Sequence, residues 1–150
     1  MFFARLVATV FGLGRLPIAP GTWGSAAALP IAWWMAPFGL VTSLAGALLL
    51  TALGTWATAR ALAHSAVADP PEIVIDETCA QWLVLALLPR EPLAYALGFA
   101  AFRVADIFKP WPAGWADRTM PGAAGVMADD LLAAPYAVGA AWAILWAIGR

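Results

Sequence analysis

Charged residues are scarce in this sequence, and lysine is almost absent. Only 11% of the 150 residues are charged, whereas 63% are hydrophobic and nine are tryptophan. Soluble domains usually carry about 25% charged residues, so this composition indicates contact with lipid. The formal net charge is −1 at pH 7. Because binding to a nucleic-acid backbone needs an excess of Lys and Arg, we expect no nucleic-acid partner.

Cysteine and histidine each occur once, as Cys79 and His64. A single cysteine excludes a disulfide framework and a cysteine-based zinc site. A single histidine excludes a phosphatase mechanism that uses two, and we expect His64 to lie in a polar connector without a catalytic role. A Cys-x5-Arg phosphatase loop is also excluded, because Leu85 stands where its arginine would be. Residues 1–14 lack a convincing cleavage site, so we expect no signal peptide.

The longest uncharged run extends over 44 residues, from Leu16 to Ala59. A helix that spans a membrane needs about 20 apolar residues, so this run is long enough for two passes. Prolines punctuate it, and the Pro-Phe-Gly sequence at 37–39 is typical of a turn. We therefore predict a helical hairpin whose first helix is capped by the side chain of Thr22 or Ser25.

Two further apolar blocks follow. The block from Thr78 to Phe102 is interrupted at 87–92, which leaves two arms of 11 or 12 residues. Such an arm is about 17 Å long as a helix, too short for a hydrocarbon layer of about 30 Å. The block at 131–149 has 19 uncharged residues and could span once. No segment alternates apolar and polar residues over a useful length. The expected fold is therefore a single all-α domain over residues 1–150, a compact membrane-embedded or membrane-associated bundle of helical hairpins without a substantial sheet.

The basic residues are distributed unevenly in this arrangement. If each hairpin returns to its side of origin, six of the eight basic residues share one face: Arg5, Arg15, Arg60, Arg103, Lys109 and Arg118. Positive residues favour the cytoplasmic side of a membrane, and tryptophan favours its interface. We therefore expect this face to be cytoplasmic. The alternative is a soluble helical domain with a very apolar core.

Acidic residues are expected on the same face, in two adjacent pairs. Asp76 and Glu77 precede one apolar helix, and Asp129 and Asp130 precede another. The helix dipole favours a carboxylate at a helix entrance, which accounts for one acid per helix but not comfortably for two. Two converging pairs would form an all-oxygen cage beside lipid, which requires a cation. Oxygen ligands without His or Cys favour Mg²⁺ over Zn²⁺. Further acids on this face are Asp69, Glu72 and Asp106, of which Glu72 and Asp106 are additional candidate ligands.

The basic candidates surround the only lysine of the chain. Arg103, Asp106 and Lys109 are spaced by three residues, so they lie along one side of a helix that should end near Phe108, before Pro110. Arginine forks and a lysine ammonium beside a metal form a receptor for phosphate. We therefore predict that Arg103 and Lys109, together with Arg118, bind a phosphate group. The alternative is that these cations only neutralise Asp106 and Asp117.

The glycine-rich segment at 12–25 offers a weaker signal. Pro17 stands where a dinucleotide-binding loop would need its third glycine, so we expect no nucleotide. The Gly21-Thr22 turn into a helix could still present N–H groups and a hydroxyl to an anion. Gly21 and Thr22 are therefore candidate substrate-binding residues.

Four segments in this order carry a resemblance to a known family: GLGRLPIAPGTWGS at 12–25, DPPEIVIDE at 69–77, FRVADIFKPWP at 102–112 and GVMADD at 125–130. Together they resemble the phosphatidylglycerophosphatase A family over nearly the whole chain. The resemblance implies an all-helical, Mg²⁺-requiring enzyme of the bacterial inner membrane that removes the terminal phosphate of phosphatidylglycerophosphate to give phosphatidylglycerol. The positions that match the motifs of the family are the turn at 20–22, Glu72, Asp76, Glu77, Arg103, Asp106, Lys109, Pro110, Asp117, Asp129 and Asp130. Alanine replaces the usual glycine of the family at Ala80, Ala123 and Ala134.

The expected chemistry is metal-assisted hydrolysis of a phosphomonoester. Asp76, Glu77, Asp129 and Asp130 would hold Mg²⁺, while Arg103 and Lys109 would stabilise charge on the phosphate oxygens. Either a water molecule or a carboxylate could be the nucleophile. One alternative is a small multipass transporter or channel, which would place its carboxylates in mid-helix around a pore. Another is a lipid alcohol phosphotransferase, whose Asp-Gly…Ala-Arg…Asp-x-x-x-Asp run is absent.

Overall fold

The computed structural model describes residues 2–67 and 70–150, so Asp69 lies outside the described residues. Within these ranges the chain forms α-helices and short 3₁₀ turns and no strand, which confirms the all-α prediction. The elements are α1 (Phe2–Ala8), η1 (Leu13–Arg15), α2 (Pro20–Met35), η2 (Ala36–Phe38), α3 (Leu40–Leu62), α4 (Ile75–Ala86), α5 (Pro92–Phe108), α6 (Ala113–Thr119) and α7 (Gly122–Ala147).

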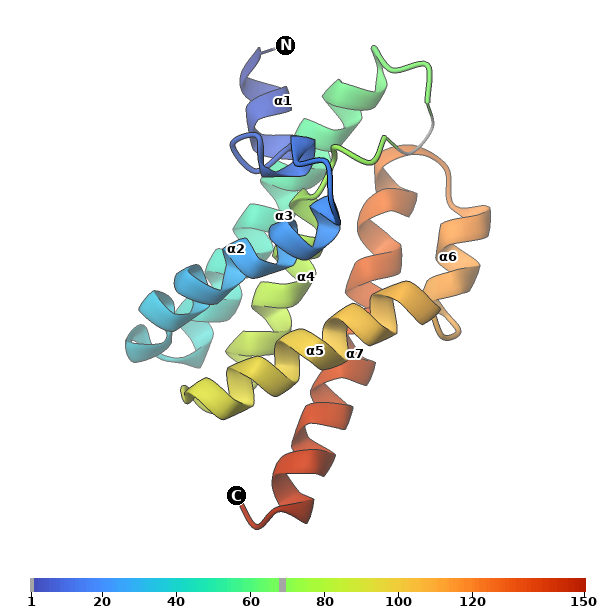
Figure 1. The fold of residues 1–150 in the computed structure, drawn as a ribbon. Helices are drawn as coiled ribbons and strands as arrows, with labels where there is room; N and C mark the ends of the chain where they lie inside the picture. Colours follow the sequence, from blue (N-terminus) through green and yellow to red (C-terminus); the bar gives the residue numbers. More distant parts are fainter. Residues whose placement is uncertain (1, 68–69) are drawn as a thin grey trace.

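Helices α2 and α3 follow each other through the predicted turn (Figure 1), but they make little contact with one another and pack mainly against α4. The turn at 37–39 is confirmed: η2 ends at Phe38 and is followed by Gly39, whose φ of 91° is accessible to glycine without strain. The predicted cap is wrong, because α2 begins at Pro20 and its N-cap residue, Ala19, makes no side-chain cap. Proline at the first helical position has a φ suited to a helix, so the helix starts there. Thr22 and Ser25 are therefore residues within the helix and not caps.

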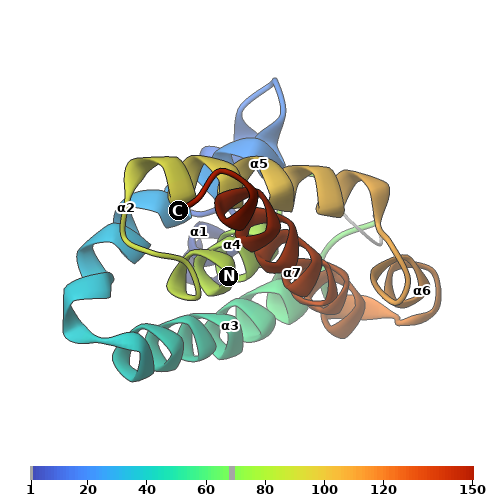
Figure 2. The ribbon, with the colours of Figure 1, turned by 90° about the horizontal axis from the view of Figure 1, so that it is seen from below.

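Helix α4 occupies the centre of the molecule, where it packs against α2, α3, α5 and α7 (Figure 2). Only small residues allow these helices to approach so closely. A Cβ added at Gly46 would lie 2.7 Å from the Trp82 ring, and one added at Gly54 would lie 2.9 Å from Ile75. Trp82 also donates a hydrogen bond to Ser43 of α3 at 3.1 Å. The start of α4 is thereby held in a defined position relative to its neighbours.

The prediction for the second block was partly correct. Helix α4 has 12 residues, as expected for one arm, but α5 extends over 17 residues. It ends at Phe108, as predicted, and Lys109 takes a left-handed φ of 45° before Pro110. Proline cannot continue the helix, so the chain turns at the lysine.

Helix α7 begins earlier than the sequence predicted. It starts at Gly122, so Asp129 and Asp130 lie two turns inside the helix and not at its entrance. The prediction of a helix start near Leu131 was therefore wrong. The physical reason is that residues 122–130 include three alanines and a methionine, which favour a helix, and that α7 packs against α4, α5 and α6.

Two described helices are long and apolar enough to cross a membrane. They are α3, with a mean hydropathy of 1.6 over its apolar window, and α7, with 1.3. Helix α2 has 16 residues, or about 24 Å at 1.5 Å per residue. It is therefore shorter than a full span, and the uncharged run at 16–59 supplies one helix of spanning length instead of two.

Candidate functional site

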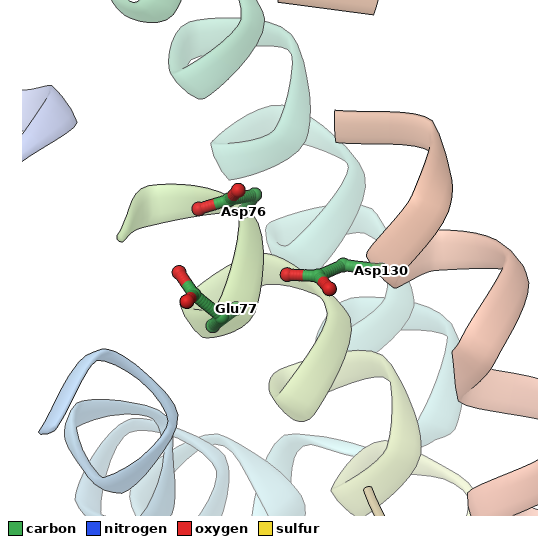
Figure 3. A group of neighbouring side chains, drawn as sticks. All are labelled: Asp76, Glu77 and Asp130. Atoms are coloured by element: carbon green, nitrogen blue, oxygen red, sulfur yellow. The ribbon is translucent and has the colours of Figure 1, made fainter. Parts of the chain in front are cut away.

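Three carboxylates from two helices meet at the centre of the bundle. Asp76 and Glu77 lie in the first turn of α4, and Asp130 approaches them from α7 (Figure 3). One oxygen from each carboxylate lies within 4.8 Å of the oxygens of the other two. Asp76 is 8% exposed and Asp130 is 3% exposed. The packing of α4 against α7 therefore brings together acids that are 54 positions apart in the chain.

Each member of this acidic cluster has an oxygen that no described residue satisfies. These atoms are Asp76 Oδ1, Glu77 Oε2 and Asp130 Oδ2, and all three are buried. Burial raises the pKa of Asp76 well above its ordinary value, and the nearby charge of Glu77 raises it further. Burial also raises the pKa of Glu77, although the charge of Arg103 partly opposes this. Unpaired buried carboxylate oxygens are costly, so this donor set fits a hard divalent cation.

Helix α2 closes one side of the acidic cluster through Gly21. A Cβ added at Gly21 would lie 2.2 Å from Glu77 Oε1 and 3.3 Å from Arg103 Nη2. Only glycine therefore allows the first turn of α2 to rest directly on the Glu77 carboxylate. In the same turn Pro20 has no N–H, and the N–H groups of Thr22 and Trp23 donate to the Ala19 carbonyl oxygen at 2.9 and 3.4 Å. The Gly21 N–H is the one that remains for an anion at this helix N-terminus.

Arg103 connects α5 to the start of α2. Its guanidinium donates to Ser25 Oγ at 3.1 Å and forms an ion pair with Asp106 at 2.6 Å. Its Nε is buried without a partner among the described residues. Arg103 is therefore held in place by two neighbours and still has donor capacity for a ligand.

Lys109 lies between two carboxylates. Its Nζ donates to Asp117 Oδ1 and to Asp129 Oδ2, each at 2.5 Å. Burial would lower the pKa of Lys109, but the hydrogen bonds and charges of these two acids outweigh it and raise that pKa, so the ammonium stays charged. Asp129 Oδ1 accepts from the backbone N–H of Asp130 at 2.9 Å. Both oxygens of Asp129 are thus engaged outside the acidic cluster.

These groups border a shared cavity of about 270 Å³. Its polar lining consists of Asp76, Glu77, Arg103, Asp106, Lys109, Asp129 and Asp130, together with Gly21 at the start of α2. A second cavity of about 220 Å³ adjoins it and is also lined by Asp76 and Asp129, with Asp117. A cavity lined by several carboxylates and two cations can bind a metal ion and a phosphate side by side.

Three predicted residues lie outside this cavity. Thr22 is in the first turn of α2 but does not line it, and Arg118 is exposed on α6. Glu72 pairs with Arg15 at 3.3 Å instead of joining the acidic cluster.

The pairings of Arg103 with Asp106 and of Lys109 with Asp117 were anticipated as an alternative to phosphate binding. Both pairings occur, and both cations also border the cavity.

Sequence reasoning missed two polar side chains. Ser25 was read only as a cap, whereas it positions Arg103. Gln81 was not considered, yet it is fully buried one turn after Glu77 and neither of its amide atoms has a partner among the described residues. The signal was available, because Gln81 is the single polar residue in the apolar run at 79–89.

Comparison with known proteins identifies a family and several relatives. The family model described as phosphatidylglycerophosphatase A matches residues 6–145. Phosphatidylglycerophosphatase A of Escherichia coli is 36% identical over 97% of this chain and 83% of its own length. The protein of that name from Haemophilus influenzae is 37% identical over 93% of this chain and 87% of its own length.

A third relative is named for a different substrate. It is a putative phosphatidylinositol-3-phosphatase of Bacteroides thetaiotaomicron, 36% identical over 99% of this chain and 97% of its own length. No solved structure matches the chain. The family model and the two relatives that share its name cover nearly the whole sequence, and the chain therefore belongs to the phosphatidylglycerophosphatase A family of lipid phosphatases.

Proposed function

We propose that this protein hydrolyses the terminal phosphate of phosphatidylglycerophosphate to give phosphatidylglycerol, a step of phospholipid biosynthesis, and that it requires Mg²⁺. The substrate is that named by the relatives from Escherichia coli and Haemophilus influenzae. The observation that carries the proposal is the set of three unsatisfied buried carboxylate oxygens beside Arg103 and Lys109. The three carboxylates alone would repel a phosphate, and Arg103 and Lys109 are already paired with aspartates. A metal ion bound to the carboxylates would allow both groups to bind the same phosphate.

The cation would be held by Asp76, Glu77 and Asp130, whose free oxygens lie close together. When bound, Mg²⁺ supplies charge neutralisation and polarisation of the phosphate and of a nucleophile. Asp129 belonged to the ligand set expected from the sequence. Because both of its oxygens have other partners, we now propose that it positions Lys109.

The phosphate would be bound between the two cations and the start of α2. Arg103 offers its guanidinium fork and Lys109 its ammonium, and each is also paired with an aspartate. The Gly21 N–H, at the start of α2, adds the positive end of a helix dipole. Asp106 and Asp117 limit the movement of the cations, and Arg118 adds positive charge on α6. These contacts favour the extra negative charge of the transition state.

Hydrolysis forms a bond from the attacking oxygen to phosphorus and breaks the bond from phosphorus to the glycerol oxygen, which takes up a proton. A water molecule is the simplest nucleophile. A carboxylate nucleophile would require a second hydrolytic step to release the phosphate. A burst of phosphate-labelled protein in rapid quench would distinguish the second route from the first.

We also propose that the protein lies in the bacterial inner membrane with the cavity facing the cytoplasm. The support is the pair of apolar helices α3 and α7 and the uneven distribution of basic residues. Arg90 and Arg150 lie at the opposite end from the cavity, where Arg150 pairs with Glu91 at 2.6 Å. The remaining six basic residues would therefore face the cytoplasm.

The proposal is tested by phosphate release in mixed micelles that contain no nucleotide. We expect turnover of phosphatidylglycerophosphate with Mg²⁺ and loss of turnover with EDTA or in Asp76→Asn. Phosphatidylinositol 3-phosphate and phosphatidic acid serve as competing substrates, because one relative is named for the former. Solute flux in proteoliposomes without phosphate release would support a transporter, and a requirement for a nucleotide-activated lipid would support a phosphotransferase. Either result would contradict the proposed hydrolase.

A further inference from the structure

Another cavity, lined by two arginines, lies near the N-terminus of the chain and apart from the two cavities of the candidate active site. It has a volume of about 350 Å³ and is formed by α1 and the turn that leads into η1. Among the residues that the structure describes, Arg5 and Arg15 line it and no acidic residue does. It shares no lining residue with the two cavities around Asp76 and Asp129. We call it the Arg5–Arg15 cavity.

The polar groups of this cavity are donors. Arg15 is oriented by Glu72, which accepts from its Nε at 3.3 Å, so its terminal nitrogens remain available. Thr9 Oγ1 accepts from the Gly12 N–H at 3.1 Å, which leaves the hydroxyl hydrogen free to donate. Two guanidinium groups and a hydroxyl donor suit an anion, and the planar guanidinium matches a phosphate with two parallel hydrogen bonds.

The rim of the cavity is aromatic and exposed. Phe2 is 81% exposed and Phe11 is 80% exposed. Phe3, on the same short helix, lies with its ring centroid 6.1 Å from that of Trp56 on α3. Helix α1 packs along α3 (Figure 1), which is one of the two described helices long and apolar enough to cross a membrane. The cavity therefore lies beside a helix that could contact lipid. Exposed phenylalanine beside arginine is suited to a lipid surface and is costly in water.

We propose that the Arg5–Arg15 cavity binds the phosphodiester of an anionic membrane phospholipid that is not the reacting substrate. The arginines take the phosphate, and Phe2 and Phe11 contact its acyl chains. The cavity is also connected to the active site through the packing of η1. Gly14 of η1 packs so tightly on the segment before α4 that a Cβ there would lie 1.9 Å from the Glu72 carbonyl oxygen. The lipid would thus stabilise the segment that leads to Asp76.

The test is a binding titration of the full-length protein in neutral detergent with EDTA, so that no turnover contributes. Fluorescent phosphatidylserine is the anionic probe, and phosphatidylcholine with the same dye is the neutral one. We expect saturable binding of phosphatidylserine about tenfold tighter than that of phosphatidylcholine. Arg5→Gln and Arg15→Gln should each weaken it about tenfold, the loss expected for one charge-assisted contact.

Arg60→Gln is the matched control, since Arg60 is an exposed arginine at the end of α3 that does not line the cavity. It should bind phosphatidylserine within twofold of the wild type. Equal weakening in Arg60→Gln and Arg5→Gln would show attraction by overall charge and overturn the proposal. Wild-type binding by both cavity variants would overturn it as well. Because Arg5 and Arg15 lie on different elements, a folding defect in one variant, seen by circular dichroism, leaves the other to decide. Since the assay involves neither Mg²⁺ nor catalysis, failure of the proposed phosphatase activity would not affect its outcome.

Discussion

The two halves of the candidate active site differ in how their charges are satisfied. In the acidic cluster of Asp76, Glu77 and Asp130, each side chain keeps a buried oxygen that no residue of the described ranges contacts by a hydrogen bond. In the basic half, Arg103 and Lys109 each pair with an aspartate. The basic half is therefore stable by itself, whereas the acidic cluster is stable only with a cation or a bound proton. This difference indicates where the metal binds, and it predicts opposite effects on stability for mutations in the two halves.

The largest effect on rate is expected from Asp130→Asn in the acidic cluster. Loss of a metal ligand should lower the rate of phosphate release about 10³-fold, because a catalytic metal contributes several kcal/mol to the barrier. The free energy of unfolding in EDTA should stay the same or rise, since a buried unpaired charge is removed. Glu91→Gln, which alters a carboxylate paired with Arg150 at the far end, is the control and should keep the wild-type rate. A strongly destabilised Asp130→Asn protein in EDTA would contradict the distinction between the two halves.

A smaller effect on rate, with a loss of stability, is expected from Lys109→Ala in the basic half. The rate should fall about 10²-fold with the loss of a charged phosphate contact. The free energy of unfolding should fall by about 1–2 kcal/mol, because Asp129 remains buried without its cation. Asp117→Asn is the matched variant, since it removes the more exposed partner of Lys109. Asp117→Asn should lower the free energy of unfolding by about 0.5 kcal/mol and the rate of phosphate release about threefold. If Asp117→Asn lowered the rate and the free energy of unfolding as much as Lys109→Ala does, the buried ion pair between Lys109 and Asp129 would not be the dominant interaction of the lysine.

The smallest effect is expected where the two halves meet, at Gly21→Ala. The added methyl group would lie 2.2 Å from Glu77 Oε1, and the carboxylate would swing aside. Because the end of a flexible side chain moves easily, stability should hardly change, but the concentration of Mg²⁺ needed for half-maximal rate should rise about tenfold. Gly139→Ala is the control, since nothing lies within 4 Å of its added Cβ on α7. An unchanged Mg²⁺ requirement in Gly21→Ala would show that the first turn of α2 does not influence metal binding.

Local sequence signals predicted the features that depend on proline and glycine. The turn at 37–39 and the end of α5 before Pro110 were both correct, because these residues restrict the backbone wherever they occur. The start of α2 was misplaced because Pro20 begins that helix without a side-chain cap. The start of α7 was misplaced because the adjacent acids were taken to mark the entrance of a helix, whereas α7 begins after Pro121 and continues through Asp129 and Asp130.

The candidate site was predictable as a set of residues but not as an arrangement. Residue types identified the acids and cations, and the expectation that the pairs would approach each other agrees with the position of Asp130 beside Asp76. Which member of the second pair faces the first could not be predicted, because the direction of each side chain depends on the rotation of α7 against α4. That rotation directs Asp130 to the acidic cluster and Asp129 to Lys109.

The most direct measurement is the thermal unfolding of the metal-free protein in neutral detergent as MgCl₂ is added. At a Mg²⁺ concentration 100 times the dissociation constant, binding should stabilise the fold by about 2.7 kcal/mol and raise the melting temperature by about 5 °C or more. Asp130→Asn should remove this rise, and Lys109→Ala should preserve it. A melting temperature that does not respond to Mg²⁺ in the wild type, or that responds equally in Asp130→Asn, would contradict the assignment of the metal to the acidic cluster.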